Sequence, residues 1–91
     1  MKIITDNKLN KYFAVTDEAI KKVKIINKEH GMDALDMAKR YYSDAKFFRD
    51  KGDYVNAFAC LNYAHGWLDD GARIGLFDVG KDSKLFTVDD K

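Results

Sequence analysis

This sequence predicts an all-α fold, an antiparallel three-helix bundle built around a long helical hairpin with a short C-terminal tail. The 91-residue chain contains no proline, the residue that most often interrupts long helices. Apolar residues recur at three- and four-residue spacing along most of its length. Lys51-Gly52-Asp53 separates two such stretches, and a glycine followed by an aspartate is typical of a tight turn between helices. We therefore expect one helical-bundle domain over residues 1–91.

The first helix is expected over residues 6–29. Asp6 would cap it, and lysines enrich its last turns, where the helix dipole favours cations. Gly31 would then stop the helix. Thr16 could instead cap a new helix, which would leave a kink near Val15. The apolar stripe that predicts this helix comprises Leu9, Tyr12, Phe13, Thr16, Ala19, Ile20, Val23 and Ile26.

The second helix is expected over residues 33–51. Gly52 follows it as a natural left-handed stop. Asp53 would cap the next helix by accepting hydrogen bonds from its first free amides. The apolar stripe of the second helix comprises Ala34, Leu35, Ala38, Tyr41, Tyr42, Ala45 and Phe48.

The third helix is expected over residues 54–75, and it is apolar on two faces. Its main stripe comprises Tyr54, Ala57, Phe58, Leu61, Ala64, His65, Leu68 and Ala72. Its second stripe comprises Ala59, Cys60, Tyr63, Trp67 and Ile74. A helix with two apolar faces is usually covered on both. This helix should therefore lie between the first and second helices, or between the second helix and a second subunit.

The tail covers residues 78–91. Its start, around Gly80, is turn-like. Residues 85–88 form a short apolar run of strand-forming types. This run could dock on the bundle, form a short strand or stay loose.

The central part of the chain resembles a known family, the archaeal domain of unknown function 357. The resemblance is tight over residues 35–79 and loose elsewhere. It implies a small helical bundle in an archaeal cytoplasm, and it implies no activity. The elements that carry it are Tyr41-Tyr42, Asp44-Ala45, Lys51-Gly52-Asp53-Tyr54, Ala57-Phe58, Asn62-Tyr63-Ala64 and Gly66-Trp67-Leu68-Asp69.

Charge and cysteine content limit the classes of function. The net charge of +1 argues against nucleic-acid binding driven by bulk charge. Residues 1–30 nevertheless carry seven lysines against four acids, so a nucleic-acid role for the lysine-rich first helix is the alternative function. Cys60 is the only cysteine, which excludes an intrachain disulfide and a cysteine-rich zinc site and fits a reducing cytoplasm. We expect no cofactor, no bound metal and no membrane span.

A polar cluster is expected on the third helix, formed by Asn62, His65, Asp69 and Arg73. A histidine oriented by a carboxylate one turn away can move protons, so a small hydrolase centred on His65 is a third hypothesis. The simpler interpretation is a structural histidine held in the core by a hydrogen bond. An ion pair between Asp69 and Arg73 is expected on the surface. No catalytic residue is assigned.

Exposed aromatic side chains are the candidate interface. Phe47 falls opposite the apolar stripe of the second helix, and Tyr63 and Trp67 lie on the second stripe of the third. Protein interfaces are enriched in such residues. We therefore expect a non-enzymatic interaction or oligomerisation module, whose partner is an unidentified protein or a second copy. Of these, a homodimer is slightly favoured, because closed twofold pairing commonly buries such a patch.

Overall fold

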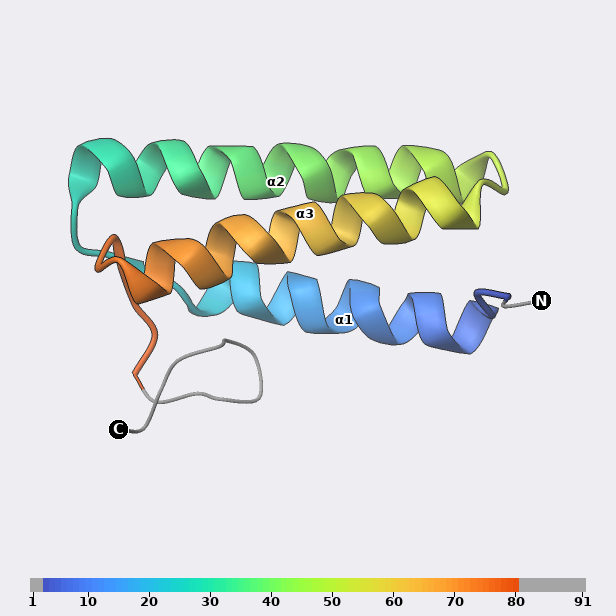
Figure 1. Ribbon diagram of the computed structural model, residues 1–91, viewed down its shortest axis with the longest axis horizontal. Helices are drawn as coiled ribbons and strands as arrows, with labels where there is room; N and C mark the ends of the chain where they lie inside the picture. The colour runs from blue at the N-terminus through green and yellow to red at the C-terminus, as the bar shows by residue number, and fades with distance from the viewer. Residues whose placement is uncertain (1–2, 81–91) are drawn as a thin grey trace.

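The computed structural model describes residues 3–80 and confirms the three-helix bundle (Figure 1). Its elements in order are α1 (Asp6–Lys22), β1 (Lys24–Ile25), α2 (Lys28–Asp50), α3 (Tyr54–Arg73) and β2 (Phe77–Asp78). Consecutive helices run antiparallel, and α3 lies between α2 and α1 in the view of Figure 1. The α2–α3 hairpin is the most extensively packed pair, and α1 covers one of its sides. The apolar strand-like run predicted at residues 85–88 lies outside the described residues.

The connection between α1 and α2 differs from the prediction. We expected one helix to continue to residue 29 and to stop at Gly31, but α1 ends at Lys22 and α2 begins at Lys28. Asn27 caps α2, since its side-chain oxygen accepts a hydrogen bond from the His30 amide at 3.0 Å. Gly31 is therefore inside α2. Gly31 is buried, and an added Cβ would lie 2.9 Å from Cγ2 of Ile25. The absence of a side chain at Gly31 therefore allows α2 to pack closely against β1.

A short antiparallel ladder, which sequence analysis did not predict, joins the segment after α1 to the segment after α3 at one end of the bundle. Lys24 pairs with Asp78 and Ile25 pairs with Phe77. The Ile26 amide also donates to the carbonyl of Leu76 at 2.9 Å. The ladder fixes the segment after α3 against the segment after α1. Two-residue strands are too short to produce an alternating apolar pattern, so sequence analysis could not detect them.

The remaining helix ends match the predictions in part. Gly52 has the expected positive φ of 78°, and Asp53 caps α3 by accepting from the Asn56 amide at 3.1 Å. At the start of α1 the cap is Thr5 and not Asp6, because the Thr5 hydroxyl accepts from the amide of Lys8 at 3.1 Å. The alternative of a kink near residue 15 is wrong, since α1 is a single helix.

The core consists of two clusters between α1 and the hairpin. One cluster lies near the β-ladder and contains Ala19, Ala34, Ala38, Leu68, Phe77 and Val79. The other lies toward the turn and contains Leu9, Phe13, Ala45, Ala57 and Leu61. Alanine predominates among the buried residues, so the helices approach one another closely. Among the described helices, none combines the length and the hydropathy that crossing a membrane would require.

Candidate protein-binding face

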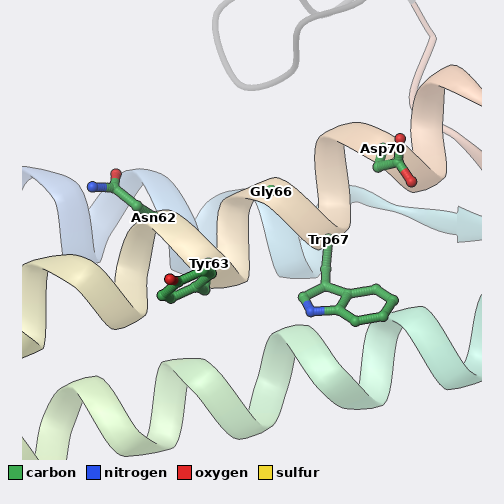
Figure 2. A pocket seen from close by; sticks show the side chains of 5 residues that line it. All are labelled: Asn62, Tyr63, Gly66, Trp67 and Asp70. Atoms are coloured by element: carbon green, nitrogen blue, oxygen red, sulfur yellow. The ribbon is translucent and has the colours of Figure 1, made fainter.

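The second apolar stripe of α3 is not covered by α1. Tyr63 is 62% exposed, Trp67 is 38% exposed and Ile74 is 64% exposed. Figure 2 shows the side chains of Tyr63 and Trp67 projecting over α2, with α1 behind α3. These residues, together with Tyr41 of α2, form a surface that we call the hairpin face. The sequence left open whether both apolar faces of α3 are covered within one chain. The structure shows that the three helices do not bury Tyr63 and Trp67.

Two hollows lie side by side on the hairpin face, with Trp67 and Asp70 shared between them. The first has a volume of about 280 Å³ and is lined by Asn62, Tyr63, Gly66, Trp67 and Asp70 (Figure 2). The second has a volume of about 270 Å³ and lies between the start of α2 and the end of α3. It is lined by His30, Asp33, Ala34, Trp67, Asp70, Gly71, Ile74 and Leu76. The two hollows make one uneven, largely apolar groove.

The aromatic rings of this face are held in place by their neighbours. The rings of Tyr41 and Tyr63 stack across the two hairpin helices with centroids 5.3 Å apart and an interplanar angle of 27°. Stacked aromatic pairs contribute beyond the area that they bury. Tyr63 is therefore positioned before any partner binds, which lowers the entropic cost of binding.

The hairpin face is also acidic. Asp33 and Asp70 line its hollows, and Asp44 is close enough to Cys60 to act on it electrostatically. Burial, followed by the charge of Asp44, raises the pKa of the Cys60 thiol. A thiol with a raised pKa is protonated at neutral pH and is a poor nucleophile.

The predicted polar cluster is only partly assembled. Asn62, His65 and Asp69 line a hollow of about 360 Å³ between α1 and α3. Nε2 of His65 lies 3.8 Å from Oδ1 of Asp69, and both side chains are 24% exposed. This contact replaces the ion pair expected between Asp69 and Arg73, which the described residues do not form. His65 is accordingly half-buried at a groove and not enclosed in the core.

The lining of this hollow defines what it can do chemically. Tyr12 and Thr16 of α1 contribute hydroxyl groups beside His65. Thr16 is buried, with 1% of its surface exposed. A separation of 3.8 Å between the imidazole and carboxylate atoms is longer than a direct hydrogen bond between them. The hollow thus brings an imidazole, a carboxylate and two hydroxyl groups together.

The model of one protein family matches residues 11–77 of this chain. Its description is "Protein of unknown function (DUF357)". The chain belongs to this family. The matched residues include most of α1, all of α2 and α3, and the start of β2. The whole hairpin face of this DUF357 chain therefore lies within the family region. No curated protein and no solved structure matches the chain.

Phe47 does not join the other two candidate interface residues. Its side chain is 55% exposed, as the helical pattern predicts. Its ring lies edge-on to Phe48, and Nζ of Lys51 lies 5.0 Å from the ring centroid. Phe47 is thus part of a separate aromatic and cationic site near the turn, whereas Tyr63 and Trp67 share a hollow.

The lysines of α1 are partly engaged within the molecule. Nζ of Lys21 lies 2.9 Å from Oδ2 of Asp17, and this hydrogen-bonded pair raises the lysine pKa. Nζ of Lys8 lies 5.5 Å from the centroid of the Phe58 ring. These contacts engage two of the lysines that the alternative nucleic-acid function would use. Within residues 3–80 no three histidine, cysteine, aspartate or glutamate side chains gather as a metal site.

Proposed function

We propose that this chain is a non-enzymatic protein–protein interaction module that binds its partner through the hairpin face. The observation that carries this proposal is the exposure of Tyr63 and Trp67 beside a core that is already closed by α1 and β2. Contiguous apolar patches on small proteins commonly mark interaction sites. Tyrosine and tryptophan are also the residues that most often dominate binding energy in interfaces.

The competing functions have less support in the geometry. A nucleic-acid surface would need a continuous basic patch, whereas Lys21 is paired with Asp17 on the same helix. A hydrolase at His65 would need an activated nucleophile, and Thr16, which lines the same hollow, is buried. A cytoplasmic location is part of the proposal, since the single cysteine fits a reducing compartment. The archaeal origin implied by the family resemblance stays a prediction.

Position-specific photo-crosslinking in cells tests this function. A photoreactive phenylalanine analogue at Tyr63 should form a covalent adduct with a protein. The same analogue at Lys11, which is exposed on α1, should form little. Trp67→Glu should abolish the adduct while circular dichroism shows that the helices are retained.

The adduct's mass identifies the partner as a second copy or as another protein, and either result supports an interaction module. Equal adduct yields from positions 63 and 11, or no adduct from position 63, would show that the hairpin face is not a binding site.

A further inference from the structure

The notch at Gly66 is an unusual feature of α3. Glycine is disfavoured in the interior of a helix relative to alanine. No atom lies within 4 Å of the position that a Cβ would occupy there, so neither backbone conformation nor crowding requires glycine. Gly66 lines the first hollow together with Tyr63 and Trp67, which lie four residues apart on one helix face, and with Asn62 and Asp70. The notch therefore offers access to the α3 backbone beside two aromatic side chains, a suitable place for a partner's side chain.

The dimensions of the groove fit a helix. The hollows extend along α3 from Asn62 to Ile74, a distance of about 18 Å at 1.5 Å per residue. That length accommodates about three turns of a second helix. Helices that bind in grooves place apolar anchors one turn apart. One such anchor can enter the notch at Gly66, and another can enter the hollow between Trp67 and Ile74.

The charge of the groove selects the chemistry of that helix. Asp33 and Asp70 line it, Asp44 of α2 acts electrostatically on Cys60 of the second stripe of α3, and the described residues form no ion pair with any of the three aspartates. Arg40, on the outer side of α2, is already paired with Asp36 at 2.9 Å. The nearby basic groups are His30, which lines the second hollow, and Arg73 at the end of α3. The groove thus has an excess of negative charge.

A second copy of this chain fits the charge poorly. In a twofold dimer the same patch meets itself. Three aspartates from each copy would then enter one interface, where like charges are costly. A partner whose flanking residues are lysine or arginine would instead pair with these carboxylates.

We propose that the hairpin face binds a basic amphipathic helix of another protein, with an apolar side chain in the Gly66 notch and cationic side chains on Asp33, Asp44 and Asp70. This inference rests on the proposed function and specifies the partner's chemistry. It also replaces the homodimer that the sequence favoured. The negative charge of the groove, which argues against self-pairing, becomes evident only when the hairpin is folded.

A synthetic helical peptide tests the inference directly. The probe is an amidated peptide of about three heptads with leucine on one stripe and lysine on its flanks. Trp67 is the only tryptophan in the chain, so its emission reports binding. We expect a blue shift on titration and an affinity that weakens as salt rises. The control peptide has glutamate in place of every lysine and should not bind.

Protein variants locate the site. Gly66→Leu fills the notch and should weaken binding of the lysine peptide at least about tenfold, because a buried apolar anchor is lost. Replacing Asp33, Asp44 and Asp70 by asparagine should weaken it about threefold for each site, as exposed ion pairs do. Glu18→Gln, on α1, is the matched control and should change nothing. Circular dichroism checks that each variant is folded.

The outcomes separate this inference from the proposed function. Equal binding of the lysine and glutamate peptides, or binding that Gly66→Leu and the asparagine variants leave unchanged, would overturn the basic helix. A doubled mass in light scattering with Trp67 shielded from quencher would also overturn it, in favour of a second copy. If position 63 still forms an adduct in cells, the interaction module stands. If position 63 forms none, both proposals fail.

Discussion

The two faces of the α2–α3 hairpin have opposite compositions. The face that packs in the core with α1 includes small side chains such as Ala38 and Ala57, which are fully buried. The opposite face carries large aromatic side chains, Tyr63 and Trp67, which remain exposed. Small residues let a third helix approach closely, whereas protruding rings leave hollows that need a complementary surface. On the function proposed above, the first face serves folding and the second serves recognition.

The largest expected change in stability comes from comparing two adjacent residues, one on each face. Leu68 is fully buried, so Leu68→Ala should lower the free energy of unfolding by about 3 kcal/mol, through lost burial and the remaining cavity. Trp67→Ala should cost much less, about 1 kcal/mol, because the indole is partly exposed. Urea unfolding of both variants measures the difference. Equal losses would mean that Trp67 belongs to the core and that the two faces do not differ in role.

Two glycines of α3 give the next test. A Cβ at Gly71 would overlap the buried ring of Phe77, so Gly71→Ala should destabilise the fold by about 2 kcal/mol. Gly66→Ala meets open space and should stabilise the isolated protein by about 0.5 to 1 kcal/mol. Thermal unfolding should therefore shift in opposite directions. A lower melting temperature for Gly66→Ala would contradict the assignment of this glycine to recognition.

The turn that joins the two helices should respond more weakly. Gly52 has a φ of 78° with no neighbouring atom within 4 Å of an added Cβ. Gly52→Ala should cost about 1 kcal/mol from left-handed backbone strain alone. Gly52→Asn, a residue that tolerates this conformation, should cost less. Denaturant titration of both variants checks the order, and an unchanged stability in Gly52→Ala would refute the strain.

The smallest effect concerns Cys60, a half-buried residue of the second apolar stripe of α3. Since its pKa is raised by burial and by Asp44, alkylation by iodoacetamide should require a higher pH in the folded protein than in urea. The thiol's contribution to stability is present below the unfolded pKa and is lost as pH rises through the folded one. Asp44→Asn should move the folded profile toward lower pH. Identical profiles in the folded and unfolded protein would place Cys60 in solvent and contradict its partial burial near Asp44.

Sequence patterns were sufficient to predict the hairpin but not the short β-ladder that joins β1 to β2. The glycine stop and aspartate cap at Gly52 and Asp53 are local signals, and the structure has both. The two apolar stripes of α3 likewise follow from helical periodicity. By contrast, the expected role of Gly31 as a stop was wrong, because its burial against Ile25 depends on a ladder formed with Phe77, far along the chain.

The candidate site was predictable to a similar degree. Tyr63 and Trp67 could be named from the second stripe, yet the notch at Gly66 could not, since a glycine within a helix gives no sign of the space around it. Asp33 comes from α2, and only the packing of the hairpin brings it to the same groove as Asp70. The separation of Phe47 from this groove likewise depends on helix rotation, which periodicity alone does not fix.

Hydroxyl-radical footprinting in cells tests the central claim most directly, because it measures whether the hairpin face is covered where the protein works. Tyr63 and Trp67 should be oxidised readily in the purified protein and protected in cells. Met32, which is 53% exposed on α2 and lies outside the hollows of the hairpin face, should be oxidised equally in both. Equal oxidation of Tyr63 and Trp67 in the purified protein and in cells would contradict the assignment of this face to partner binding.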